Sequence, residues 1–195
     1  MLLKQLLSAA AIAMTFIAFY PYIRSISLNV IKPHVFSWVI WGTTTFVVFL
    51  AQLEDNAGVG AWPIGVSGII TLFIAYLAFI KRTDITITKT DWWFFIVAMS
   101  SIPFWYVTSD PLWAVIILTI VDILGFGPTI RKIHAQPYSE SLMFFSLFLT
   151  RNLLVIAALE NYSLTTVLFP AVIALACMLL NITIMYQRSV LASKK

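Results

Sequence analysis

Charged side chains are scarce in this sequence of 195 residues. Asp, Glu, Lys and Arg make up 10% of it and hydrophobic residues make up 61%, whereas charged residues account for about 25% of a soluble domain. So few charges cannot cover a water-soluble globule with polar surface, and the composition therefore predicts a membrane protein. The apolar stretches show no two-residue alternation, which favours an all-α polytopic protein over a membrane β-barrel.

Cysteine and the usual catalytic motifs are nearly absent as well. Cys177 is the single cysteine, so no internal disulfide can form, and its apolar surroundings indicate a packing role. The sequence has no glycine-rich phosphate loop, no paired catalytic carboxylates and no nucleophile beside a base, so we expect that the protein is not an enzyme. His34 and His134 lack partners at metal-ligand spacing, so we predict neither a metal site nor a cofactor.

Long apolar runs make up most of the chain. A spanning helix needs about 20 predominantly apolar residues, and seven runs reach or approach that length. The predicted helices are Leu6–Tyr22, Val35–Gln52, Trp62–Ile80, Trp92–Thr108, Leu112–Ile130, Ser141–Leu159 and Leu164–Tyr186. The sequence therefore predicts seven transmembrane helices.

The loops between these helices alternate in charge. Most of the 12 basic residues lie in the loops after the first, third and fifth helices or near the C-terminus. The other loops hold the acidic residues Glu54, Asp55, Asp110 and Glu160. By the positive-inside rule, the N-terminus lies outside and the C-terminus is cytoplasmic. The net charge of +4 is spread over several loops and forms no stripe, so it does not indicate a nucleic-acid partner.

A short element near the end of the first helix recurs in the fifth. Residues 21–26 read PYIRSI and residues 128–133 read PTIRKI, so the proline, both isoleucines and the arginine are repeated. We interpret residues 1–82 and 112–195 as two copies of a three-helix unit, joined by a connector, 83–111, that contains the fourth helix. The extra helix gives both copies the same orientation, so the sequence predicts parallel repeats in a 3+1+3 arrangement.

This arrangement resembles the superfamily of PQ-loop and SWEET-like (MtN3-type) small membrane transporters. The resemblance rests on Pro21 and Pro128, at the cytoplasmic ends of the first and fifth helices, and on the 3+1+3 layout. Tyr22 and Thr129 stand where the motif that names the family has glutamine, which indicates a divergent, bacterial-type member. The resemblance implies alternating access, with Pro21 and Pro128 as hinges. Without it, both prolines are equally well explained as residues that stop a helix.

Two ionisable residues, Asp122 and Arg151, lie inside predicted helices. A charged side chain at the bilayer centre costs about 2.5–3.5 kcal/mol on insertion scales. At a rise of about 1.5 Å per residue, both residues come near the midplane, on consecutive antiparallel helices. Two interpretations stay open: a buried ion pair that fixes the two helices, or a polar site on the path of a substrate or of protons.

Four further side chains are candidates for contact with a substrate. The superfamily places asparagines on the third helix of each unit, facing the substrate, and the resemblance therefore implies such a role for Asn181. Asn152 is a second candidate, although an interhelical hydrogen bond explains either asparagine as well. Trp38 and Trp41 could stack on a ligand ring or simply pack in the membrane.

These features predict a SWEET-like transporter that moves a small polar solute across the cell membrane by alternating access. The lipid bilayer is the second expected partner, protons are a third candidate, and a homo-oligomer is an open alternative. A receptor or scaffold on the same fold is the alternative function. It would bind a partner through the cytoplasmic basic loops, with Arg24, Lys32, Arg131 and Lys132 as the contacts.

Overall fold

The computed structural model describes residues 1–30, 33–81, 87–138 and 140–193. Lys32 and Arg82 lie outside the described residues. Five helical residues are described by their backbone alone, and these are Asp91, Gly127, Pro128, Arg131 and Lys132.

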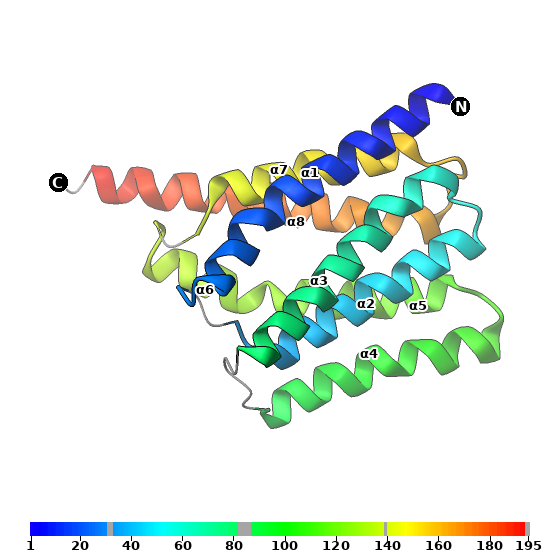
Figure 1. Ribbon diagram of the computed structural model, residues 1–195, viewed down its shortest axis with the longest axis horizontal. Coiled ribbons are helices and arrows are strands. Elements are labelled where there is room, and N and C mark those ends of the chain that lie inside the picture. Colours follow the sequence, from blue (N-terminus) through cyan, green and yellow to red (C-terminus); the bar gives the residue numbers. More distant parts are fainter. Residues whose placement is uncertain (31–32, 82–86, 139, 194–195) are drawn as a thin grey trace.

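The described chain is all-helical, as the sequence predicts, and each of the seven apolar runs falls on helix (Figure 1). The elements are α1 (Leu2–Ser27), α2 (Val35–Glu54), the short 3₁₀ helix η1 (Gly58–Ala61), α3 (Trp62–Ile80), α4 (Lys89–Thr108), α5 (Leu112–Gly125), α6 (Gly127–Ala135), α7 (Leu142–Ala158) and α8 (Leu164–Ala192). In Figure 1, α1 runs alongside α7, and α4 lies at the edge of the bundle beside α2 and α5.

Several helices begin at a side chain that caps the first turn. Ser141 accepts a hydrogen bond from the Phe144 amide at 3.2 Å before α7. Ser163 and Thr166 cap one another reciprocally before α8, in the arrangement called a capping box. Such caps satisfy amide groups that have no partner within the helix, so they fix where these helices start.

Four segments are long and apolar enough to cross a membrane: Leu2–Ser27, Val35–Glu54, Gly58–Ile80 and Leu164–Ala192. Three shorter apolar helices accompany them, spanning Trp92–Thr108, Leu112–Gly125 and Leu142–Ala158. Length and composition therefore suit much of the bundle to a bilayer.

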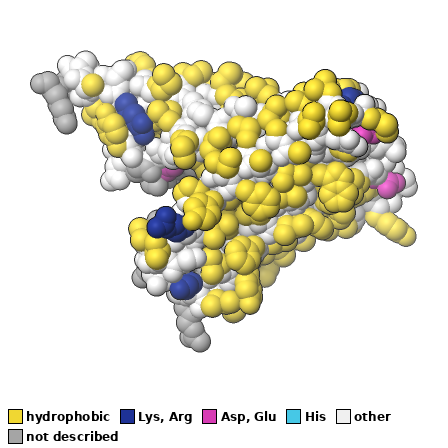
Figure 2. Space-filling model, turned by 45° about the horizontal axis from the view of Figure 1, so that its top comes forward, with side chains coloured by type: hydrophobic (Ala, Val, Ile, Leu, Met, Phe, Trp, Pro, Cys, Tyr) yellow, Lys and Arg dark blue, Asp and Glu magenta, His cyan; other side chains and the backbone are white. Residues whose placement is uncertain are grey.

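The surface of the bundle is unusually apolar, although the core is apolar as well. Large apolar side chains such as Phe16, Ile17 and Leu179 are more than half exposed, and hydrophobic side chains cover most of the face seen in Figure 2. Arg151 and Asn152, by contrast, are buried. A soluble monomer rarely exposes so much contiguous apolar surface, so this surface fits hydrocarbon rather than water.

The predicted fifth helix, Leu112–Ile130, is wrong as a single element. The structure divides it into α5 and α6, with a break at Phe126. Two glycines flank Phe126, and the following proline has no amide hydrogen to continue the ladder. Proline is well tolerated in a first helical turn, where its missing hydrogen bond costs nothing, and Pro128 occupies that position in α6.

Pro21 behaves differently from Pro128, the proline of the second occurrence of the motif. Helix α1 continues through Pro21 as far as Ser27, so the interpretation of Pro21 as a helix stop is wrong. Because proline has no N–H, the carbonyl of Ile17 loses its usual partner within the helix. The same short motif therefore lies within a continuous helix in one copy and just after a helix break in the other.

Helices α2 and α3 pack so closely that glycine is required between them. A Cβ added to any of three glycines would come within 2.7–3.0 Å of a residue on the facing helix. The facing pairs are Gly42 with Leu72, Gly65 with Phe49 and Gly68 with Phe46. These three contacts fix the antiparallel register of the two helices.

Candidate solute-binding cavity

A cavity of about 620 Å³ lies between α1, α2, α3 and the helices α5 to α8. Its lining residues Pro21, Ser141 and Met143 are exposed, whereas Arg151 at the other end is buried. The cavity therefore opens at the end of the bundle where α1 finishes and α7 begins. The outline of the molecule is indented at this end, on the left of Figure 2.

Aromatic rings form much of the cavity wall. Phe148 packs against Phe144 with ring centroids 4.6 Å apart and against Phe19 with centroids 5.3 Å apart. On the facing side, Trp38 contacts Tyr22, with centroids separated by 4.9 Å, and Trp41 lies edge-on to Trp38. Ring pairs of this kind hold one another in place, so the walls are apolar and preorganised.

Arg151 holds the deep end of the cavity through three hydrogen bonds to neutral groups. Its Nε donates to the Thr15 hydroxyl at 3.2 Å, its Nη1 donates to Asn152 Oδ1 at 3.1 Å, and its Nη2 donates to the Pro63 carbonyl at 2.6 Å. The guanidinium also lies over the Phe148 ring, 5.6 Å from its centroid. These contacts tie α7 to α1 and α3, and they fix the position of the positive charge.

Asn152 holds Arg151 in place and does not line the cavity. It is fully buried, its Nδ2 donates to the Phe148 carbonyl at 2.7 Å, and its Oδ1 accepts from Arg151. It is not among the lining residues. Asn152 therefore acts as a positioning residue for the guanidinium.

Asp122 lines the same cavity from α5 and shares a hydroxyl with the backbone of α2. Thr44 Oγ1 lies 3.0 Å from Asp122 Oδ1 and 2.9 Å from the Trp41 carbonyl oxygen. A hydroxyl has one hydrogen, so Thr44 can donate to only one of these oxygens at a time. When it donates to Trp41, a protonated Asp122 can donate to Thr44 instead. The contact therefore accommodates both protonation states of the carboxyl group.

The expected direct ion pair between Asp122 and Arg151 is absent from the described residues. Asp122 contacts Thr44, and Arg151 contacts three neutral acceptors. The matching depth expected for the two residues assumed an unbroken fifth helix that ends near Lys132, and the structure divides that helix at Phe126. Both residues nevertheless line one cavity.

The remaining candidates divide between the cavity and the helix interfaces. Trp38, Trp41 and Pro21 line the cavity, whereas Asn181 does not. Asn181 Nδ2 donates to Ser146 Oγ at 3.2 Å, and its Oδ1 has no partner among the described residues. The backbone of Pro128 lies in α6, and its side chain lies outside the described part of the chain.

The end of the bundle opposite the cavity mouth is closed by hydrogen bonds between α1, the α2–α3 loop and the α7–α8 loop. Ser8 Oγ donates to the Val59 carbonyl at 2.6 Å, and Lys4 Nζ donates to the Leu159 carbonyl at 2.5 Å. A Cβ added to Gly60 would lie 2.8 Å from the backbone of Leu159. We call these contacts, together with those that Asp55 and Gln52 make with the start of α8, the acidic-end seal.

The seal continues between the two loops themselves. Asp55 accepts from Asn161 at its backbone carbonyl, at 2.8 Å, and from the Ser163 hydroxyl at its carboxylate. Gln52 Nε2 donates to the Thr166 carbonyl at 2.8 Å. Side-chain and backbone groups thus join the end of α2 to the start of α8.

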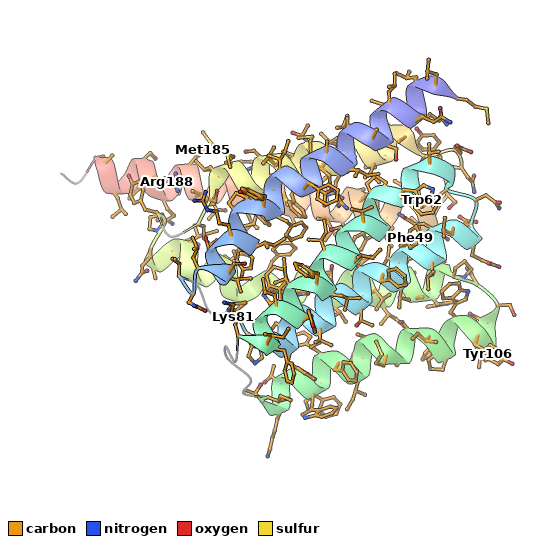
Figure 3. All side chains as sticks on the ribbon, in the orientation of Figure 1. Phe49, Trp62, Lys81, Tyr106, Met185 and Arg188 are labelled. Atoms are coloured by element: carbon orange, nitrogen blue, oxygen red, sulfur yellow. The ribbon has the colours of Figure 1, made fainter. Side chains whose placement is uncertain are left out.

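At the cavity mouth, two basic side chains bond to carbonyl groups within their own half of the chain. Lys81 Nζ donates to the Ser27 carbonyl at 3.2 Å, and Arg188 donates to the carbonyls of Pro137 and Glu140. Lys81 and Arg188 lie at the left end of Figure 3, whereas Tyr106 lies at the opposite end. The mouth is therefore at the basic end of the molecule, and the seal is at the acidic end.

Sequence reasoning missed the groups that hold the two charges. Thr15 and Thr44 are two of several threonines in the apolar runs, and threonine commonly bonds to its own helix in a membrane. The carbonyl of Pro63 has no sequence signal at all. The offset of 107 residues that pairs Pro21 with Pro128 also pairs Thr15 with Asp122, and it is the one hint that Thr15 lies at the site.

Comparison with protein-family models, curated protein sequences and solved structures gives no match to this chain.

Proposed function

We propose that the protein is a SWEET-like transporter that moves a small polar solute across the cell membrane by alternating access. The proposal includes seven membrane-spanning helices in a 3+1+3 arrangement, an outer N-terminus and a cytoplasmic C-terminus. Asp122, Arg151, Trp38 and Trp41 contact the solute. Asn152 and Asn181 act from behind the cavity wall, and Pro21 and Pro128 are the hinges.

A single observation carries this proposal: one cavity is open at one end of the bundle and sealed at the other. An alternating-access carrier exposes a central site to one side at a time, and the site lies between its two repeats. The seal joins segments from the first and second halves of the chain. The cavity likewise receives residues from both halves.

The charge distribution indicates which side of the membrane the cavity mouth faces. The mouth lies beside basic residues such as Lys81 and Arg188, and by the positive-inside rule this end faces the cytoplasm. In this proposal the cavity is open to the cytoplasm, which corresponds to an inward-open conformation. Asp122 adds protons as a candidate second partner, because its contact with Thr44 serves both protonation states.

Uptake into proteoliposomes tests the proposal directly. Purified protein is reconstituted and offered labelled sugars, amino acids and vitamins, with empty liposomes as the control. We expect saturable uptake of at least one class, and no uptake of any class would contradict the transporter proposal. Stoichiometric capture of a partner protein, lost when Arg24 is neutralised, would favour a receptor or scaffold instead.

The direction of opening can be tested separately on vesicles of known orientation. On a Cys177→Ser background, Ser25→Cys places a thiol at the mouth and Tyr162→Cys places one beside the seal. A membrane-impermeant maleimide should label the first thiol from the cytoplasmic side and the second from the outside. The opposite pattern would reverse the proposed orientation.

A further inference from the structure

We propose that the cavity binds an elongated dipolar solute, with an anionic group at Arg151, a cationic group at Asp122 and an apolar body between them. An ω-amino acid, with its amine and carboxylate at opposite ends, is the simplest example. The inference rests on the transporter proposal and deepens it by naming the class of substrate.

The first ground is that each charge lines the cavity without an opposite charge beside it. A guanidinium has five N–H donors, and three are used by Thr15, Asn152 and Pro63. One N–H on each terminal nitrogen of Arg151 therefore has no partner within the described chain. Two such donors match the two oxygens of a carboxylate.

Asp122 supplies the complementary charge at a different place in the same cavity. Thr44 donates to Oδ1 at most, so the rest of the carboxylate is available for a ligand. Ionised carboxylates accept strong hydrogen bonds from ammonium groups. A solute with only one charge would leave either Asp122 or Arg151 uncompensated in a cavity with apolar walls, which is costly.

The second ground is the separation of the two charges along the bundle. Gly65 faces Phe49, so Pro63, two residues before Gly65, lies level with Ala51 on the antiparallel α2. Arg151 is bonded to Pro63, whereas Asp122 is bonded to Thr44, seven residues from Ala51. At about 1.5 Å per residue, the offset is about 10 Å.

This offset sets a minimum length for the solute. Each charge-assisted contact takes up about 2.8 Å, which leaves roughly 4 Å or more between the charged groups of the solute. In an α-amino acid, a single carbon separates the amine from the carboxylate, which is too short. Phe148, three residues before Arg151 on α7, lies on the mouth side of the guanidinium, and rings such as this one suit a chain of methylene groups.

Thermal unfolding of the purified wild-type protein provides the test, because a ligand that binds the folded state stabilises it. The probes are glycine, γ-aminobutyrate and ε-aminocaproate, which lengthen the spacer between the same two charges. Caproate and hexylamine keep the chain of ε-aminocaproate with one charge each. D-glucose is the neutral probe.

We expect ε-aminocaproate to give half-maximal stabilisation at a concentration lower by about tenfold or more than glycine, caproate or hexylamine, because two charged contacts form at once. Equal potency of glycine would overturn the length requirement. Equal potency of either singly charged probe would overturn the requirement for two charges.

Two substitutions test whether Arg151 and Asp122 cause the preference for a solute with two charges. Arg151→Gln should reduce the potency of ε-aminocaproate to that of hexylamine, and Asp122→Asn should reduce it to that of caproate. Thr150→Val is the matched control, because Thr150 neighbours Arg151 but is exposed and bonds to its own helix. If Arg151 and Asp122 had a purely structural role, each substitution would lower stability. It would not reduce the potency of ε-aminocaproate to that of one particular singly charged probe.

Failure of this inference can be told apart from failure of the transporter proposal. Stabilisation and uptake of D-glucose without any response to the dipolar probes would leave a transporter of another substrate class and would overturn the inference. Stabilisation by ε-aminocaproate without uptake of it or of any other solute would support the site and contradict transport. No stabilisation by any dipolar probe overturns the inference.

Discussion

Thr44 Oγ1 and Asp122 Oδ1 lie 3.0 Å apart across the interface of α2 and α5, and Thr44 Oγ1 also lies 2.9 Å from the Trp41 carbonyl oxygen. Asp122 has no other hydrogen-bond partner in the described chain. The charge on α5 is therefore positioned by a neutral side chain from α2. The single hydrogen of Thr44 makes this contact sensitive to whether Asp122 is protonated.

Thr44→Val should weaken both stability and solute binding. The substitution keeps the shape of the side chain but leaves a partly buried carboxyl oxygen without its partner, at a cost of about 1 kcal/mol. Thermal unfolding and uptake measurements check both effects. Thr43→Val is the matched control, since Thr43 is adjacent on α2 and has no hydrogen bond to Asp122. Equal effects of the two substitutions would refute the role of Thr44.

Asp122→Asn and Arg151→Gln should act independently on stability. Because the residues form no ion pair, the effects of the two substitutions should add within about 0.3–0.5 kcal/mol. Arg151→Gln and Thr15→Val share a hydrogen bond and should instead show a coupling of about 0.5–3 kcal/mol. Double-mutant cycles on unfolding free energies measure both quantities. Strong coupling between Asp122 and Arg151 would restore the ion-pair interpretation.

The sequence predicts the helices well because each apolar run is long enough to be recognised without any periodic pattern. The break at Phe126 could not be predicted in the same way, because Phe126 lies only four residues before the predicted end of the helix at Ile130. Glycine and proline near Phe126 permit a break, but only packing decides whether one forms. At Pro21 the helix continues, although that proline belongs to the same repeated motif.

The candidate site was predictable in its charges but not in their partners. Asp122 and Arg151 stand out because ionised groups are expensive in a bilayer. The acceptors of Arg151 include the carbonyl of Pro63, and every residue in the chain has a carbonyl group. Which carbonyl meets the guanidinium depends on how α3 packs against α7, and no local pattern specifies that.

Pro21→Ala should stabilise the protein and slow transport. Alanine supplies the amide hydrogen that the carbonyl of Ile17 lacks, and a proline within a helix costs about 3 kcal/mol relative to alanine. If α1 bends at Pro21 during transport, the stiffer helix should lower the uptake rate while the solute still binds. Pro103→Ala is the matched control, because Pro103 lies inside α4, which does not line the cavity. An unchanged uptake rate in Pro21→Ala would contradict the hinge at this position.

Gly60→Val should open the acidic-end seal. A Cβ at this position would lie 2.8 Å from the Leu159 backbone, and backbone cannot move aside as a flexible side chain can. Overpacking of this kind typically costs about 1–3 kcal/mol, and that cost falls on the sealed conformation alone. The balance should therefore shift toward a conformation that is open at the acidic end.

The accessibility of Ala11 reports that shift, because Ala11 is fully buried on α1 behind Ser8. On a Cys177→Ser background, Ala11→Cys should react slowly with an impermeant maleimide added from outside. Adding Gly60→Val should raise this rate by about tenfold, since 1.4 kcal/mol is a factor of ten in an equilibrium. Val59→Ala is the control, because it leaves the carbonyl that accepts from Ser8 in place. If Gly60→Val instead unfolds the protein, Ala11→Cys will react faster with maleimide added from either side of the membrane. An outside-only increase is the result that the seal predicts, and no increase would show that the loops do not gate access from this side.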